Sequence, residues 1–209
     1  MAAKLRYLVP AVLAAVACSV PAANAGLIGN LLSNCPTGGT QIFAPWGDAA
    51  YYLLAPNGSF ELGSYGWSLS GGAAVVNGNE PFLPTGTHSL ALPSGSKAMS
   101  PTVCLGTQQL YIRLFLKDLG GTDQGLRVRV YWYGLLNKLL GSTDFAVFPS
   151  GSDWTPSGQV RSGGGLLAPL PVVSLLSSTS ARVEITPLGS GSRWQIDDLY
   201  IDPYISRVG

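Results

Sequence analysis

Residues 126–133 of this chain read Leu126-Arg127-Val128-Arg129-Val130-Tyr131-Trp132-Tyr133. In this run the even-numbered residues are all apolar, and the odd-numbered residues are all arginine or tyrosine. Because successive side chains of a strand point to opposite faces of a sheet, an alternation of period two predicts a β-strand with one buried face and one face in water. Such a strand is typical of an antiparallel sheet that covers a core on one side only.

The same kind of signal recurs along the rest of the chain. Residues 109–117 also alternate, with an aliphatic row opposite Tyr111, Arg113, Phe115 and Lys117. Shorter strands are expected at residues 73–76, 89–92, 139–148, around Val160, 181–186 and 194–201. The 27 Gly and 15 Pro residues supply turns between these segments, and no segment shows a sustained helical period. Many short strands with Gly-rich turns predict an all-β fold, an antiparallel β-sandwich.

The N-terminal 25 residues carry a different pattern. Two basic residues precede an almost wholly apolar run over residues 8–20, and Ala23-Asn24-Ala25 has small residues at the two positions that signal peptidase reads. These are the parts of a secretory signal peptide, and an apolar run of about 13 residues is too short to span a bilayer. We expect a secreted chain without a membrane span, cleaved after Ala25, with lipoprotein processing at Cys18 as the alternative.

Cleavage would leave two cysteines, Cys35 and Cys104. In an oxidising compartment their simplest fate is one intramolecular disulfide, and free thiols or a bond to another chain are the alternatives. The predicted organisation is a signal peptide at 1–25, an N-terminal arm at 26–56 that packs on the domain, a β-sandwich at 57–204 and a short tail at 205–209.

Two segments at the ends of the predicted sandwich carry a family resemblance. The first is Asn57-Gly58-Ser59-Phe60-Glu61, followed by Gly66-Trp67, and the second is Trp194-Gln195-Ile196-Asp197-Asp198-Leu199-Tyr200-Ile201. They resemble the opening and closing motifs of galactose-binding-like jelly rolls of the carbohydrate-binding-module type. The resemblance spans about residues 57–202. It implies a jelly roll whose first and last strands are neighbours, glycan binding on a concave sheet and a structural ion near these ends.

The residues themselves are compatible with an ion at the same place. Asp197 and Asp198 must point to opposite faces of their strand, so one of them needs a partner for a carboxylate away from water. In this topology Glu61 lies nearby, and calcium takes oxygen ligands from carboxylates and carbonyls. We therefore expect Glu61 and Asp198, with loop carbonyls, to hold a structural calcium ion. The alternative is that Glu61 and Asp197 accept hydrogen bonds from turn amides or pair with an arginine.

A candidate ligand face follows from the two alternating strands, provided that they belong to one sheet. Its residues would be Tyr111, Arg113, Arg127, Arg129, Tyr131 and Tyr133. Flat aromatic rings match the apolar faces of sugar rings, and arginine supplies planar donors for hydroxyl groups. The alternative is that the aromatic residues pack under the N-terminal arm, which is itself rich in aromatic residues.

Enzyme classes find little support. His88 is the only histidine, and no G-x-S-x-G, H-E-x-x-H or C-x-x-C pattern occurs. The charge is +1 for the whole chain and −1 without the two basic residues of the signal peptide, which gives no basic footprint for nucleic acid. We expect a non-catalytic module that binds a carbohydrate or cell-envelope glycan. The alternatives are a structural or protein-interaction β-sandwich of the cell surface, and a hydrolase using carboxylates such as Asp144, Asp153 and Glu184.

Overall fold

The computed structural model describes residues 35–36, 38–105, 110–121, 125–147, 152–162 and 180–203. The predicted signal peptide with Cys18, the first residues of the arm and the tail at 205–209 lie outside the described residues. No helix in the described part is long and apolar enough to cross a membrane.

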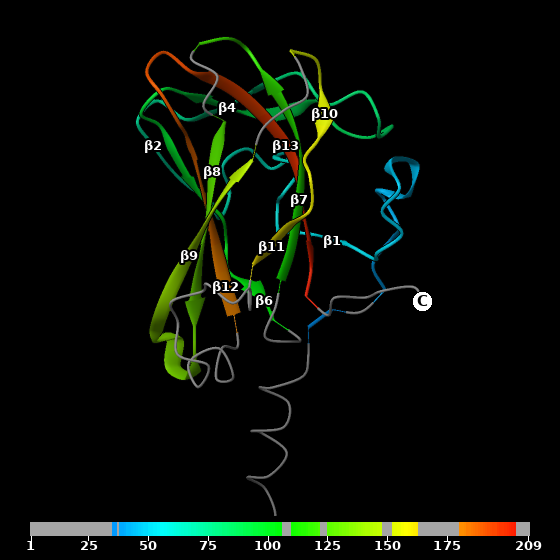
Figure 1. The fold of residues 1–209 in the computed structure, drawn as a ribbon, viewed down its shortest axis with the longest axis vertical. Helices are drawn as coiled ribbons and strands as arrows, with labels where there is room; N and C mark the ends of the chain where they lie inside the picture. The colour runs from blue at the N-terminus through cyan, green and yellow to red at the C-terminus, as the bar shows by residue number, and fades with distance from the viewer. Residues whose placement is uncertain are drawn as a thin grey trace, which may run out of the picture.

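The described strands form two antiparallel sheets that pack face to face (Figure 1). Sheet 1 has the order β10 (Thr155–Pro156), β7 (Leu110–Asp118), β13 (Arg193–Asp202), β4 (His88–Pro93) and β3 (Ala74–Asn77), with β1 (Leu53–Leu54) beside β13 and β11 (Val160–Ser162) beside β7. Sheet 2 has the order β2 (Ser68–Ser70), β5 (Lys97–Met99), β12 (Ser180–Pro187), β8 (Leu126–Tyr133) and β9 (Leu139–Val147), with β6 (Val103–Cys104) beside β12. Two single-turn 3₁₀ helices are η1 (Ala44–Trp46) and η2 (Leu135–Asn137). The predicted antiparallel β-sandwich of jelly-roll type is confirmed.

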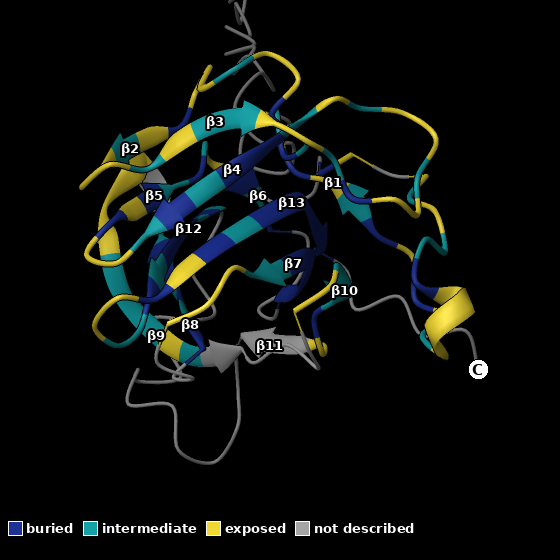
Figure 2. Cartoon of the chain, turned by 90° about the horizontal axis from the view of Figure 1, so that it is seen from above, coloured by how far each residue is buried: buried dark blue, intermediate teal, exposed yellow. Residues whose placement is uncertain are grey.

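The main core lies between the two sheets (Figure 2). Strand β8 alternates between buried and half-buried residues along its whole length, as its sequence predicts. Its apolar row ends at Trp132, which is fully buried and donates its indole N–H to the hydroxyl of Thr143 on β9, at 3.0 Å. One face of sheet 2 therefore covers the core, and the other face carries the arginines and tyrosines of β8.

Strand β7 departs from its predicted pattern. Its alternation predicts one face in water, but residues 110–116 are all buried. The reason is a second apolar cluster on the outer face of sheet 1, where Phe43 and Tyr52 of the N-terminal segment pack with Tyr111, Phe115 and Tyr200. The ring of Phe43 lies 5.4 Å from that of Phe115 and 5.5 Å from that of Tyr200. Residues 43–52, the covering segment, thus lie over the face of β7 that its alternation predicts to be in water.

The opening and closing segments of the domain meet, as the end motifs imply. Leu53 and Leu54 of β1 pair with Ile201 and Tyr200 of β13. Just beyond β1, a Cβ atom on Gly58 would lie 2.7 Å from the carbonyl oxygen of Leu199, so only glycine permits this approach. The backbone N–H of Leu199 donates to the carbonyl of Gly58 at 3.1 Å. The glycine of the opening motif is therefore required by the closing strand.

The two cysteines form the predicted disulfide, Cys35–Cys104, with their Cα atoms 5.3 Å apart. Cys104 belongs to β6 of sheet 2, whereas the residues that follow Cys35 cross the outer face of sheet 1. The bond therefore ties the covering segment to the opposite sheet, and such a bond is stable in an oxidising compartment.

Candidate functional site

The six candidate ligand residues do not share a face. Strand β7, with Tyr111 and Arg113, belongs to sheet 1, and β8 belongs to sheet 2. The expectation that both rows lie in one sheet is therefore wrong, because sequence alternation fixes which side chains share a face of a strand but not which strands share a sheet. The two rows point to opposite outer surfaces of the sandwich.

Arg113 is enclosed under the N-terminal segment. Its side chain is 7% exposed and pairs with Asp48, whose Oδ2 lies 2.8 Å away. The guanidinium also donates to the carbonyl of Ser157 from Nε and Nη2, at 3.0 and 2.6 Å, and lies 4.1 Å from the centre of the Phe43 ring. Burial acts to raise the pKa of Asp48, but hydrogen bonds from Tyr52, Ala50 and Arg113 outweigh it and lower that pKa. In this structure Arg113 is enclosed and has a packing role.

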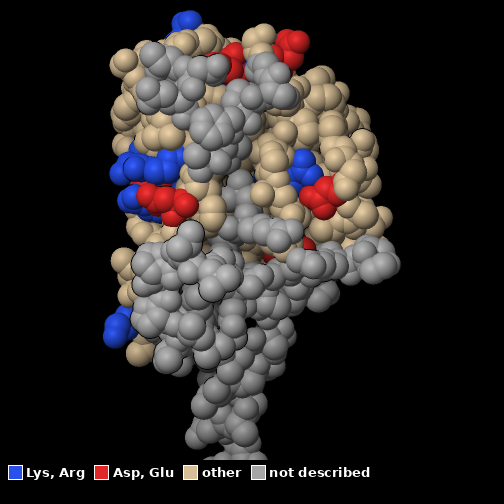
Figure 3. All heavy atoms as spheres, in the orientation of Figure 1, with Lys and Arg blue, Asp and Glu red and all other residues tan. Residues whose placement is uncertain are grey.

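The outer face of sheet 2 carries the remaining four candidates. Arg127, Arg129, Tyr131 and Tyr133 are all half-buried and form one row along β8. The neighbouring strands add further side chains to this face at matching register positions, namely Lys97, Arg182, Glu184, Ser142 and Asp144. Basic and acidic side chains gather at the left of Figure 3, in the region where β8 and β9 lie.

Glu184 on β12 is the centre of this face. Only 2% of it is exposed, and its carboxylate lies 3.3 Å from Lys97 Nζ and 3.8 Å from Arg127 Nη2. The hydroxyl of Tyr131 donates to the same carboxylate at 3.4 Å. One buried carboxylate thus contacts two cations and a tyrosine hydroxyl, and its negative charge lies beneath the positive charges of Lys97 and Arg127.

Arg129 and Asp144 form the second ion pair of this face. Two guanidinium nitrogens of Arg129 donate to the two carboxylate oxygens of Asp144. The hydrogen bond from Arg129 lowers the pKa of Asp144, and the same bond raises the pKa of Arg129. In the cross-strand register Glu184 and Asp144 flank Arg129, so the two carboxylates are separated by a cation. The sequence predicts Asp144 and Glu184 only as candidate carboxylates of a hydrolase. Arg182 and Glu184 alternate with apolar residues along β12, and this alternation indicates that both side chains lie on the outer face of sheet 2.

A buried acidic cluster lies where β13 bulges, and it consists of Glu80, Asp197 and Asp198. Burial, with the charges of Asp198 and Glu80, raises the pKa of Asp197 to about 8. Burial, with the charges of Glu80 and Glu61, raises the pKa of Asp198 to about 7. Asp198 is 4% exposed and its Oδ2 has no hydrogen-bond partner. Glu80 lies in a loop, and no sequence pattern around it predicts its place in this cluster.

Glu61 lies near this cluster but is already engaged. It accepts hydrogen bonds from the backbone N–H groups of Thr87 and His88, both at 2.8 Å. Burial acts to raise the pKa of Glu61, but these bonds and those from the two side chains lower it to about 2. Among the described residues, no group of three or more His, Cys, Asp or Glu side chains converges as metal ligands. The unpartnered oxygen of Asp198 fits a cation, and any further ligands would have to include carbonyls.

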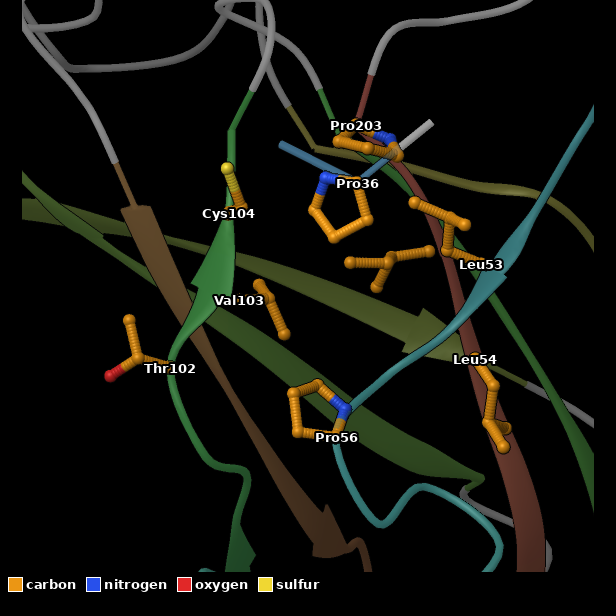
Figure 4. Close-up of a pocket in the computed structure, with 9 residues that line it drawn as sticks. Pro36, Leu53, Leu54, Pro56, Thr102, Val103, Cys104 and Pro203 are labelled. Carbon is orange, nitrogen blue, oxygen red and sulfur yellow. The ribbon is translucent and has the colours of Figure 1, made fainter. Parts of the chain in front are cut away.

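A pocket of about 210 Å³ lies between β1, β6 and the end of β13, beside the disulfide (Figure 4). Its lining is almost wholly apolar: Pro36, Leu53, Leu54, Pro56, Thr102, Val103, Cys104, Ile201 and Pro203. Figure 4 shows Pro36, Leu53 and Val103 pointing toward one another, whereas the Thr102 hydroxyl points away from them. A sugar needs polar groups to orient its hydroxyls, so this pocket does not suit a glycan.

No protein-family model and no curated protein matches this chain. Solved structures do match. A family 16 carbohydrate-binding module is 17% identical, with a TM-score of 0.47 over 72% of this chain and 99% of that one. A family 61 carbohydrate-binding module, solved with β-1,4-galactotriose, is 16% identical, with a TM-score of 0.42 over 71% of this chain and 97% of that one. The enzymatically active domain of tailspike protein 4 of bacteriophage CBA120 is 14% identical, with a TM-score of 0.47 over 70% of this chain, which spans only 21% of that structure.

By its own strand order the chain is a two-sheet antiparallel jelly roll, and the carbohydrate-binding modules above are similar to it at low identity. At these identities the likeness concerns the fold alone. The assignment of the fold rests on this chain's own strand order and register.

Proposed function

We propose that this protein is a secreted, non-catalytic module that binds a glycan on the outer face of sheet 2. The observation that carries the proposal is the half-buried row of Arg127, Arg129, Tyr131 and Tyr133 on β8. Residues 43–52 cover the outer face of β7, and no described segment covers this row of β8 in the same way. Tyrosine rings stack on sugar rings, and guanidinium groups donate to hydroxyls in a fixed plane. The contacts of Glu184 with Lys97, Arg127 and Tyr131 hold these side chains in place before a ligand arrives, which reduces the entropy that binding must overcome.

Replacing Tyr131 by alanine is expected to weaken glycan binding at least tenfold, because it removes both a ring and the hydroxyl that donates to Glu184. Arg129→Ala should have a similar effect. Binding would be measured on a glycan array and then by isothermal titration with the best ligand. The matched controls are Tyr65→Ala and Arg193→Ala, which change exposed residues outside sheet 2 and should leave affinity unchanged.

Retained affinity in both Tyr131→Ala and Arg129→Ala would remove the proposed site. An absence of binding to every glycan on the array would favour the alternative, a structural or protein-interaction module of the cell surface.

We also propose that Glu61 and Asp198, with backbone carbonyls, bind a structural Ca²⁺ ion. The support is the buried Oδ2 of Asp198, which has no hydrogen-bond partner, and the charges of Glu80 and Glu61, which raise the pKa of Asp198 together with a side-chain hydrogen bond between Asp198 and Glu80. A divalent cation would relieve both, because calcium binds ionised carboxylates and carbonyl oxygens. The ion would fix the closing strand against the loop that begins β4 and would take no part in chemistry.

The acidic cluster predicts how stability depends on pH and calcium. Without divalent cations, Asp197 and Asp198 bind protons more tightly when folded than when unfolded, where their pKa returns to about 3.8. Their contribution to stability is complete below that pH and is lost as pH rises through 7 to 8. The free energy of unfolding in EDTA should thus fall as the pH rises from 5 to 8, because the folded state binds more protons than the unfolded state over this range.

Adding 5 mM CaCl₂ at pH 8 should raise the melting temperature by several degrees, and Asp198→Asn should reduce both effects. Mg²⁺ at the same concentration is the control, since it prefers an octahedral, partly hydrated site. A melting temperature at pH 8 that does not respond to calcium would refute the ion but leave the pH dependence standing.

A further inference from the structure

The outer face of sheet 2 differs in charge from the rest of the molecule. Four cations lie on it, Lys97, Arg127, Arg129 and Arg182, against two acids, Glu184 and Asp144. Of the 12 Lys and Arg residues in the chain, two lie in the predicted signal peptide, which leaves ten against 11 Asp and Glu. Among the described residues away from this face there are five basic and eight acidic residues. The cations are concentrated on the face to which we assign the glycan.

The arrangement of these charges makes the exposed surface more positive than the count of four cations and two acids suggests. The Glu184 side chain is 3% exposed, whereas that of its partner Lys97 is 49% exposed and that of Arg127 is 32% exposed. The negative charge lies beneath, and the positive groups reach into solvent. Because fields from groups at a low-dielectric surface act over roughly 8 Å at physiological salt, a ligand on this face meets a net positive potential.

The second acid is placed so that a ligand could replace it. Asp144 is 44% exposed and lies on β9, the last strand in the order of sheet 2. Its carboxylate occupies the planar donor fork of Arg129, the arrangement that arginine forms with carboxylate groups in general. Exposed ion pairs of this kind are worth little in stability, so a carboxylate brought by a ligand can compete for the same donors.

We propose that the glycan bound by this face is anionic, a polysaccharide whose sugars carry carboxylate or sulfate groups. This inference rests on the function proposed above and specifies its ligand class. Tyr131 and Tyr133 supply surfaces for the sugar rings, and the four cations supply partners for the acidic groups. A polysaccharide fits better than a nucleic acid, because the chain as a whole has no basic excess.

The test is isothermal titration with pairs of polymers that differ only in charge. Polygalacturonate and its methyl ester form one pair, and chondroitin sulfate with its desulfated, carboxyl-methylated form is the other. Desulfated chondroitin that keeps its carboxylates then separates carboxylate from sulfate recognition. At 20 mM NaCl the acidic member of at least one pair should bind ten times more tightly or better. That advantage should shrink at least fivefold at 300 mM NaCl, since exposed charges are screened.

Variants distinguish recognition of the acidic groups from non-specific binding to the protein surface. Lys97→Ala and Arg182→Ala should each weaken binding of the acidic polymer several-fold and leave binding of the neutral polymer unchanged. Asp144→Asn should strengthen binding of the acidic polymer, because it releases the donors of Arg129. Lys117→Ala and Arg193→Ala, on sheet 1, are the matched controls and should change nothing.

Equal affinity for both members of each pair, with binding still lost in Tyr131→Ala, would overturn the anionic ligand and leave the proposed function intact. Binding to no acidic polymer would overturn it as well, and a failure of every glycan on the array would overturn the proposed function too. Tighter binding of single-stranded DNA than of any acidic polysaccharide at equal salt would replace the glycan with a nucleic acid.

Discussion

Replacing both Cys35 and Cys104 by alanine is expected to lower the free energy of unfolding by about 4 kcal/mol. The two residues are 69 positions apart, and the chain-entropy model assigns roughly this value to opening a loop of that length in the unfolded state. The bond also links the covering segment of sheet 1 to β6 of sheet 2. Its loss should therefore loosen Phe43 and Tyr52 over β7 before the main core melts.

Urea unfolding followed by tryptophan fluorescence measures this effect. The slope of the transition should increase in the double variant, because the unfolded chain without the cross-link exposes more surface. Wild-type protein reduced with dithiothreitol is the matched control and should unfold at the same urea concentration as the variant. A loss below 1 kcal/mol in both samples would contradict the prediction and show that the sheets hold the segment without the bond.

Strand β8 shows how far the sequence alone leads. Its predicted bounds, 126–133, are those of the structure, and its alternation predicts the buried and half-buried faces residue by residue. The reason is that β8 faces water on one side, so the period of two survives in its composition. The closing strand was also predicted, at 194–201 against the observed Arg193–Asp202. The two-residue and three-residue strands β1, β2, β5, β6 and β10 have no such period and were not predicted.

The candidate site was only half predictable, for a physical reason. Tyr111 and Arg113 have the same alternation as Arg129 and Tyr131, because a polar row facing water and a polar row under a covering segment look alike in sequence. What separates them is a contact with residues 43–52, about 60 to 70 positions earlier in the chain. Glu184 was missed as the centre of a face for a related reason, since its partners Lys97 and Arg127 come from two other strands.

Removing the carboxylate of Asp48 tests whether the polar row of β7 is sealed under residues 43–52 or open to water. Asp48→Ala is expected to lower the free energy of unfolding by about 3 kcal/mol, because breaking a buried ion pair leaves a charge without its counter-ion. Arg113 would keep its hydrogen bond to the carbonyl of Ser157 and its contact with the ring of Phe43, but neither group carries a formal charge. Since the pKa of Asp48 is lowered by folding, its contribution is present above its ordinary pKa of 3.8 and lost as pH falls through the lowered value. The variant should therefore lose part of the acid sensitivity of the wild type.

The matched control is Asp144→Ala, which breaks the exposed pair with Arg129 and should cost less than about 1 kcal/mol. Adding Arg113→Met to Asp48→Ala should restore much of the lost stability, because an apolar side chain of similar length can fill the space beneath Phe43. If Asp48→Ala proved as mild as Asp144→Ala, water would reach Arg113 and the segment would not seal β7. Tyr111 and Arg113 would then return as ligand residues, on a second face opposite the one proposed above.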